Sequence, residues 1–380
     1  MKTATIFKYV FLYGLALFET FCFLRYISSD HERSLLNTKS IHTKDSREIQ
    51  TELVNLQATS TLQATSTLQA SSSRNVTGNV TTSPTAEPAQ LTTVSGQPVV
   101  NPHRFKFTMH NQDACFNRSN SNGELFLVLL VKCAPFEKLD REQIRKTWGG
   151  VKEVFGRRVL TMFLLGESTD PIIRKQIQEE NREFHDLIQE DFIDVYVNLT
   201  YKNMMGLKWI SMYCPQTSFV FSVDADMMIN IVTLVRRLSK MPKTDFAEGH
   251  LRTNVIVERG KKSKWYIPKE VYAPKRYPPF LNGACYAMSR DVAVRVFDKS
   301  KYVPFLRLDD AFVGIIMSKI GVIPMLSPMY EQYSGKYAEA MEKGIGVGIL
   351  HNRHRLNDTM LSLWHKLVGS QIEQINKTSQ

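Results

Sequence analysis

The chain has few cysteines, five among 380 residues, and no cysteine or histidine spacing typical of a zinc site. It also lacks a basic run interleaved with aromatic residues, although its formal net charge is +11. Because the basic residues are spread along the whole chain, this charge does not indicate nucleic-acid binding. An anionic ligand would give the excess charge a use, and an ordinary solubilising surface is the alternative.

The N-terminal segment lacks the small residues that a signal peptidase requires, since bulky side chains occupy 21–24. An apolar stretch follows Lys2 and Lys8 and is just long enough to cross a thin bilayer. The sequence therefore predicts a cytoplasmic tail over 1–8 and a transmembrane signal anchor over 9–27, with a cleavable signal peptide as the alternative. Because the basic flank stays in the cytosol, the remainder would be lumenal.

Residues 28–110 are rich in Ser, Thr, Gln, Ala and Pro, and the hexad Leu56–Thr61 is repeated at 62–67. Such a segment buries too little apolar surface to offset its ordering entropy. We expect a flexible stem there, open to O-glycosylation. The rest, 111–380, suits one large α/β domain.

Two further patterns agree with a lumenal, oxidising compartment. Six Asn-x-Ser/Thr sequons are spread along the chain, and their number carries more weight than any single one. They are Asn75, Asn79, Asn117, Asn198, Asn357 and Asn376. Four cysteines lie outside the anchor and predict two disulfides, with three connectivities open. They are Cys115, Cys133, Cys214 and Cys285.

Strand-like and helix-like patterns alternate through the first half of the domain. Strand patterns occupy 125–131, 159–165, 192–197 and 219–224. Helical patterns occupy 172–186, 200–213 and 231–238, and Asp140 with Gln143 resembles a capping box that opens a further helix. This alternation predicts an α/β fold with a mostly parallel twisted sheet flanked by helices, in which ligands sit beyond the carboxyl ends of the strands.

The strand pattern at 219–224 ends in two carboxylates one residue apart, Asp224 and Asp226. Carboxylates at a strand exit can hold a hard divalent cation against a phosphate, because their oxygens match its coordination chemistry. A solvated turn at the strand end is the alternative for so short a motif.

Five segments carry a longer pattern, in this order: 141–149, 191–202 with 206–209, 223–230, 264–266 with 277–286, and 308–314. Together they resemble the Golgi β-1,3-glycosyltransferases, the inverting family of β-1,3-galactosyltransferases and β-1,3-N-acetylglucosaminyltransferases. The chain departs from that family at five positions. Ala225 replaces the middle Asp of its acidic triplet, Asn203 a usual Thr, Asp309 a usual Glu, Leu281 a frequent Cys, and Cys285 a usual Gly.

The resemblance implies a GT-A-like domain that displaces a nucleoside diphosphate with inversion at the sugar. Asp310 is the implied catalytic base, and capping of a helix over 311–320 is its alternative role; Asp309 could be the cap instead. It also implies Mn²⁺ held chiefly by Asp226, with Asp224 orienting the ribose or a metal-bound water. His351 is the preferred third ligand, and His354 remains open.

Other side chains are expected to bind the donor. Arg141 and Arg145 lie four apart on one helix face, suited to a diphosphate or equally to a structural ion pair. Lys202 is a second diphosphate candidate, Trp265 could stack on a sugar or uracil face, and Gly283 could allow a turn beside the donor.

The function expected from this resemblance is transfer of galactose from a UDP-sugar donor to a glycan acceptor on protein or lipid. The alternatives are transfer of N-acetylglucosamine and a lumenal glycan-binding protein that has lost turnover, for which Ala225 and Asp309 would be the first lesions. The expected location is the Golgi membrane in a single-pass type II orientation. A homodimer is left open.

Overall fold

The computed structural model describes residues 98–116, 125–330, 344–348, 360–362, 364–369 and 371–372. The predicted anchor over 9–27 lies outside these residues, and within them no helix is long and apolar enough to cross a bilayer. Part of the expected stem, 98–110, is ordered. Its strand β1 (Phe107–Met109) pairs with β5 (Leu187–Ile193), so the folded domain begins before residue 111.

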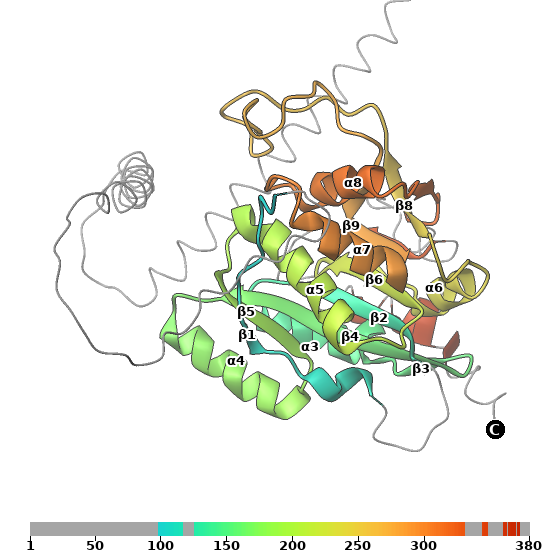
Figure 1. Cartoon of the computed structure of the whole chain (residues 1–380). Helices are drawn as coiled ribbons and strands as arrows, with labels where there is room; N and C mark the ends of the chain where they lie inside the picture. The colour runs from blue at the N-terminus through green and yellow to red at the C-terminus, as the bar shows by residue number, and fades with distance from the viewer. Residues whose placement is uncertain are drawn as a thin grey trace, which may run out of the picture. The chain divides into compact units, whose positions relative to one another are not determined.

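One half of the main sheet is parallel (Figure 1). Strand β2 (Leu125–Lys132) lies between β4 (Arg157–Glu167) and β6 (Phe219–Asp224), and β5 follows on the far side of β4. All three pairings are parallel. Every residue of β2 is buried, which explains its unbroken apolar run.

The other half of the sheet is largely antiparallel. Strand β9 (Phe280–Ser289) runs antiparallel to β6 and to β8 (Ala247–Arg252), whereas β10 (Met325–Leu326) is parallel to β8. The strand order is β1-β5-β4-β2-β6-β9-β8-β10, with β3 (Glu153–Val154) against β4. A separate pair is formed by β7 (Met227–Ile229) and β11 (Gly346–Gly348). The sheet is therefore mixed, because the chain after β6 returns in the opposite direction.

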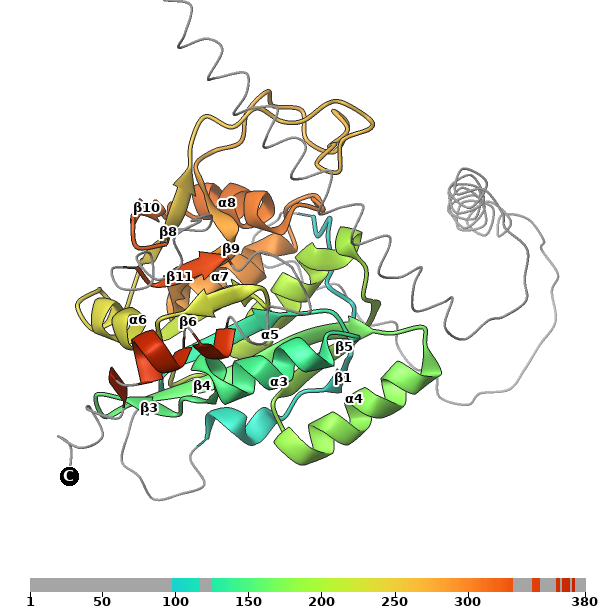
Figure 2. The same cartoon turned by 180° about the vertical axis from the view of Figure 1, so that it is seen from behind.

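Helices cover both faces of the sheet. Helices α5 (Leu199–Tyr213), α7 (Arg290–Ser300) and α8 (Asp309–Lys319) pack on the face seen in Figure 1. Helices α3 (Lys138–Lys146), α4 (Pro171–Phe184) and α6 (Ile231–Leu238) contribute to the core on the other face, toward the viewer in Figure 2. From Leu127 to Val131 the side chains of β2 alternate between these two cores, as a strand with helices on both sides requires.

Two local expectations from the sequence are wrong. The strand expected at 192–197 is β5, which ends at Ile193, and the 3-10 helix η3 (Tyr196–Asn198) follows it. The turn is fixed by Asp194, whose carboxylate accepts the Gly166 amide proton at 2.7 Å. The capping box is absent, because α3 already begins at Lys138 and has no side-chain hydrogen bond at its N-cap.

A single disulfide is present among the described residues. It joins Cys115 to Cys214 and so ties the 3-10 helix η1 (Gln112–Cys115) to the end of α5. The expected second disulfide is wrong: Cys133 and Cys285 are free and buried. Cys133 directly follows β2 and Cys285 lies in β9, two strands that β6 separates, and each fills core space as a small apolar side chain.

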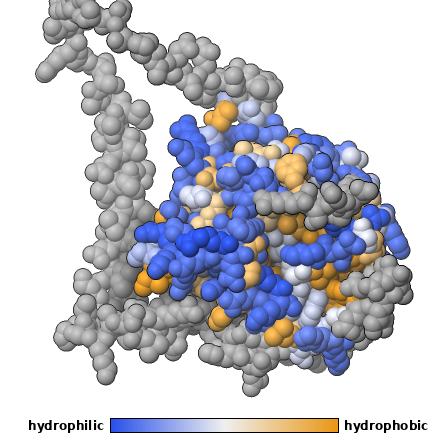
Figure 3. Space-filling model, turned by 90° about the horizontal axis from the view of Figure 1, so that it is seen from below, coloured by the Kyte–Doolittle hydropathy of each residue, from blue (hydrophilic) through white to orange (hydrophobic). Residues whose placement is uncertain are grey.

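The surface is mainly hydrophilic on the face seen in Figure 3, with apolar side chains scattered between charged ones. Such scatter is ordinary for a soluble domain. A different pattern occurs in and before η3, where three consecutive apolar residues are exposed: Val195 by 44%, Tyr196 by 51% and Val197 by 43%. A contiguous exposed run of this kind is a better candidate for contact with a ligand.

Candidate active site

A buried lysine joins two acidic segments that are far apart in the sequence. Lys132 ends β2 and lies in register with Asp224 at the end of β6. Its Nζ is 3.1 Å from Asp224 Oδ1 and 3.1 Å from Asp309 Oδ2, at the start of α8. It also donates to the Gly283 carbonyl at 2.9 Å. One ammonium group therefore fixes the ends of β2 and β6, strand β9 and the N-terminus of α8 around one point.

Asp309 is held from a second side by α5. Asn203 donates to Asp309 Oδ2 at 3.2 Å and to the Tyr286 hydroxyl at 2.9 Å. Asp309 is only 5% exposed and Asn203 is fully buried. The expectation that Asp309 might cap α8 is therefore wrong, because its carboxylate faces inward toward Lys132.

Asp310 lies beside this cluster, and its carboxylate accepts a hydrogen bond at the N-terminus of α8. Its Oδ1 accepts the amide proton of Ala311 at 2.7 Å. Gly283 packs directly on it: a Cβ at that position would lie 3.3 Å from the Asp310 Cβ. Gly283 is inside β9 and not in a turn, so its role here is to allow this close approach.

The site is short of positive charge, and the pKa values reflect this. Burial would lower the pKa of Lys132, but the charges of Asp224 and Asp309 outweigh it and hold that pKa well above its ordinary value. Burial, followed by the charge of Asp309, raises the pKa of Asp310 to about 6. The pKa of Asp224 is also raised, by burial and by Asp226 and Asp309 against the opposing effect of Lys132. Its side chain keeps 36% exposure.

Asp226 lies in the turn between β6 and β7 and is partly exposed. The middle residue, Ala225, is 7% exposed and packs into the core, so the two carboxylates on either side of it are the ones at the surface of the turn. Pairing of β11 with β7 places Gly348 opposite Met227, the residue after Asp226. His351 and His354 lie outside the described residues, within which no group of three or more acidic, His or Cys side chains forms a metal site.

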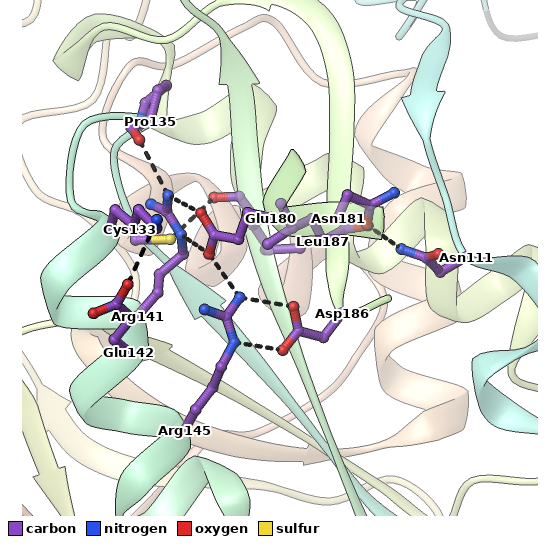
Figure 4. A network of polar contacts seen from close by, with 12 residues as sticks. Asn111, Cys133, Pro135, Arg141, Glu142, Arg145, Glu180, Asn181, Asp186 and Leu187 are labelled. Carbon is purple, nitrogen blue, oxygen red and sulfur yellow. Dashed lines mark hydrogen bonds and ion pairs between the residues drawn. The ribbon is translucent and has the colours of Figure 1, made fainter. Parts of the chain in front are cut away.

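The structure places Arg141 and Arg145 in a separate network (Figure 4). Arg141 is fully buried, and its Nε and Nη2 donate to the two carboxylate oxygens of Glu180 at 2.8 and 2.7 Å. Arg145 donates to Glu180 at 2.7 Å and to both oxygens of Asp186 at 2.8 Å. Of the two roles left open by the sequence, the ion pair is the one observed, and neither guanidinium is brought to the acidic cluster.

Lys202 is also committed to the protein. It is 5% exposed, its Nζ is 2.8 Å from Asp194 Oδ1, and it donates to the Cys133 carbonyl at 2.6 Å. It thus ties α5 to the ends of β2 and β5. Trp265 lies on the long excursion between β8 and β9 and is 38% exposed, which leaves its ring accessible.

One sequon lies within the described residues. The side-chain amide of Asn198 donates to the Ile193 carbonyl at 2.9 Å, so attaching a glycan there would compete with this bond. Asn75, Asn79, Asn117, Asn357 and Asn376 lie outside the described residues.

Known proteins that are similar in sequence show the family of this chain. A family model described as galactosyltransferase matches residues 139–327, which include both acidic segments. β-1,3-Galactosyltransferase 1 of Mus musculus is 33% identical over 242 residues, covering 63% of this chain and 72% of the relative. The chain belongs to the galactosyltransferase family. β-1,3-Galactosyltransferase 5 of Homo sapiens is 41% identical over 198 residues, covering 52% of this chain and 64% of the relative.

Membership of the galactosyltransferase family makes the chain a glycosyltransferase. A solved galactosyltransferase, LgtC, matches with 8% identity and a TM-score of 0.36 over 63% of this chain and 96% of that chain, too low for a structural argument.

Sequence reasoning missed the residue at the centre of this acidic cluster, Lys132. Its signal was available, because a lysine directly after an unbroken apolar strand is a buried charge that needs partners. The reasoning also missed Tyr286, which bonds Asn203, because a buried tyrosine in a strand is ordinary in a core.

Proposed function

We propose that this chain transfers galactose from UDP-galactose to a sugar hydroxyl of a glycan acceptor and forms a β-1,3 linkage with inversion. Support comes from its relatives, which are β-1,3-galactosyltransferases. The observation that carries the proposal is the convergence on Lys132 of Asp224 and Asp309, from segments 85 residues apart in the chain (309 − 224). A mixed sheet with helices on both faces is compatible with a GT-A-like domain.

In this proposal Asp310 is the general base. The amide of Ala311 orients one of its oxygens, and Gly283 packs against its Cβ without blocking the carboxyl group. A pKa near 6 leaves it deprotonated at neutral pH while keeping more basicity than an ordinary aspartate, which suits removal of a proton from an acceptor hydroxyl. Lys132 holds Asp309 away from that hydroxyl.

The metal proposed for the donor is Mn²⁺, and the donor set fits a hard cation because Asp226 and Asp224 both offer carboxylate oxygens at the strand exit. Asp226 would be the principal ligand, since Asp224 is shared with Lys132. His351 is the proposed third ligand. When bound, the metal neutralises the departing diphosphate. Arg141, Arg145 and Lys202 would support the site through the fold, because each is tied to a carboxylate of the protein.

The departures from the family pattern do not favour a protein that has lost turnover. Asn203 is longer than the Thr it replaces and Asp309 is shorter than the Glu it replaces, and these two side chains are hydrogen-bonded to each other. One change therefore compensates the other. Ala225 is packed in the core, so the loss of the middle carboxylate still leaves Asp224 and Asp226 at the strand exit.

We further propose a type II orientation in the Golgi membrane, with the anchor at 9–27 and the folded domain in the lumen. Support comes from the sequence alone: the basic N-terminal flank, the apolar stretch and the sequons.

The test is transfer by the full-length chain in detergent micelles with Mn²⁺, UDP-galactose or UDP-N-acetylglucosamine, and a panel of sugar acceptors. Galactose should be transferred, the product should be cleaved by a β-1,3-specific galactosidase, and chelation of the metal should stop the reaction. Preferential transfer of N-acetylglucosamine would replace the proposed donor. Binding of glycans with neither transfer nor hydrolysis of either donor would show a glycan-binding protein instead.

A further inference from the structure

Beside Asp310 lies a second cluster of polar side chains that the proposed reaction has not used. Tyr277 is 6% exposed, and its hydroxyl has no hydrogen-bond partner among the described residues. The Nε of Arg307 is buried and is likewise without a partner in this part of the chain. Buried polar atoms are normally satisfied, so two unsatisfied ones close together indicate that something else satisfies them.

Packing and charge place Tyr277 near both Asp310 and Arg307. Gly314, one turn along α8 from Asp310, is in such close contact with β9 that an added Cβ would lie 2.2 Å from the Phe280 Cβ. Tyr277 precedes this contact by three residues and packs edge-on against Phe280, with ring centroids 5.9 Å apart. Its hydroxyl lies within electrostatic reach of both Asp310 and Arg307. Burial raises the pKa of Tyr277 to about 12, so its hydroxyl remains a donor at neutral pH.

Arg307 is a cation without an acid. The only bond it makes to a described residue is from Nη2 to the Lys264 carbonyl at 2.9 Å, and it forms no ion pair within the described ranges. This differs from Arg141 and Arg145, which are both paired with carboxylates. An arginine held in place by a carbonyl keeps its remaining donors for an oxyanion that presents two oxygens, such as a carboxylate or a sulfate.

The surface around Arg307 is also positively charged. The excursion between β8 and β9 has six exposed basic side chains against two exposed acids, Glu258 and Glu270. The basic ones are Lys261, Lys262, Lys264, Lys269, Lys275 and Arg276. Because the Lys264 carbonyl accepts a hydrogen bond from Arg307, this positive surface continues to the edge of the candidate active site. Such a surface raises the local concentration of anionic molecules.

The half-exposed Tyr196 completes the cluster from the opposite element, η3. Its hydroxyl lies within electrostatic reach of Asp224, Asp309, Asp310 and Arg307, so it borders both the acids and the arginine. With the neighbouring exposed Val195 and Val197, it offers an apolar face and a polar tip, which is the combination that binds sugar rings.

We propose that Arg307, Tyr277 and Tyr196 form the acceptor subsite, and that the preferred acceptor is an anionic glycan whose carboxylate or sulfate pairs with Arg307. This rests on the proposed function, because the subsite is defined by the hydroxyl that Asp310 deprotonates. Tyr277 donates to a ring hydroxyl of the acceptor, and Tyr196 packs against its sugar face.

Steady-state kinetics of the full-length chain test this, with three disaccharides that differ only in carrying no charge, a sulfate or a uronic acid. The wild type should show a KM about tenfold lower for at least one charged acceptor, and this advantage should shrink as salt is raised. The difference between the sulfate and the uronic acid identifies the anion. Equal KM values for all three acceptors would overturn the proposal while leaving galactose transfer intact.

Variants test whether the lower KM for charged acceptors arises from this subsite. Arg307→Gln should raise the KM of the preferred charged acceptor by about 10- to 50-fold, with little change for the neutral one. Tyr277→Phe should raise the KM of all three acceptors by about fivefold, the loss expected for one neutral hydrogen bond. The matched control is Lys319→Gln, which removes one positive charge from the exposed far end of α8 and should change nothing.

Two further measurements distinguish failure of the acceptor subsite from failure of the proposed function. If Arg307→Gln weakens UDP binding or slows hydrolysis of UDP-galactose without an acceptor, Arg307 belongs to the donor and the inference is wrong. Arg307→Lys, which keeps the charge, covers the case in which the glutamine variant fails to fold. If the wild type shows no turnover, binding of the three disaccharides by calorimetry replaces KM: charge-dependent binding lost in Arg307→Gln would keep the anion site and reject the proposed function.

Discussion

The acidic cluster around Lys132 and the arginine network on α3 are built from the same kinds of group but differ in balance. In the arginine network, two guanidiniums meet two carboxylates, Glu180 and Asp186. Around Lys132, one ammonium serves Asp224 and Asp309, and Asp310 lies beside them. The first set is neutral as a whole, whereas the second carries excess negative charge.

The pKa directions differ in the same way. Burial acts to raise the pKa of Glu180, yet the hydrogen bonds and charge of Arg141, followed by those of Arg145, outweigh it and lower that pKa. The pKa values of Asp224 and Asp310 are raised. A balanced network stabilises the fold, whereas an unbalanced one needs a cation or holds a proton, which is what metal binding and base catalysis use. Charge balance therefore separates the acids that support the fold from those proposed to carry the chemistry.

The largest expected effect comes from Asp310→Asn. The substitution keeps the size of the side chain and removes its basicity, so kcat should fall by about 10²- to 10⁴-fold with UDP binding unchanged. Initial rates and UDP titration by calorimetry measure the two effects. Asp298→Asn, on the exposed end of α7, is the control and should be silent. Substantial activity in Asp310→Asn would place the base elsewhere.

Breaking the balanced network should affect stability rather than chemistry. Glu180→Ala leaves two buried or half-buried guanidiniums without their shared acid, at a cost of about 3–5 kcal/mol in the free energy of unfolding. Its neighbour Glu179 has a side chain that is 52% exposed and pairs only with Lys175 at 3.9 Å, so Glu179→Ala should cost about 0.5 kcal/mol or less. Urea unfolding compares the two.

The comparison would fail if Glu180→Ala removed activity at unchanged stability. That result would mean that Arg141 or Arg145 binds the donor.

Removing one acid from the unbalanced cluster should weaken metal binding. Asp226→Ala should lower the affinity for Mn²⁺ in the presence of UDP by about 10- to 100-fold, because a principal carboxylate ligand is lost. Titration of Mn²⁺ by electron paramagnetic resonance measures this directly. Asp245→Ala, an exposed acid with 73% side-chain exposure, is the control. An unchanged titration would move the metal site away from β6.

The smallest effect expected is on the pH profile. Because Asp310 acts in its deprotonated form and its pKa is raised to about 6, kcat should be constant near pH 7.5 and fall as pH drops through 6, to about a tenth at pH 5. The pH dependence of transfer measures the midpoint. A midpoint near 4, as for an exposed aspartate, would show that the neighbouring acids do not influence the base.

Much of the fold was already fixed by local patterns. The buried strand at 125–131, the strand ending in Asp224 and the helix at 231–238 were predicted to within a residue, because each has a long apolar run with clear ends. The end of β5 at Ile193 was not predictable, since it depends on the hydrogen bond from the Gly166 amide to the Asp194 carboxylate. The antiparallel strands β8 and β9 were not predicted, because the segment between them has no simple hydrophobic period.

For the site, the sequence by itself determined the acids at 224, 226 and 310 and, through resemblance, the roles expected of them. Tertiary structure decided which charges meet. Arg141 and Lys202 were both expected to bind the donor and Lys132 was overlooked, yet each of the three is paired with a different carboxylate once the strands are brought together. The physical reason is that a buried charge must be paired, and its partner is chosen by proximity in space, which local residue patterns do not encode.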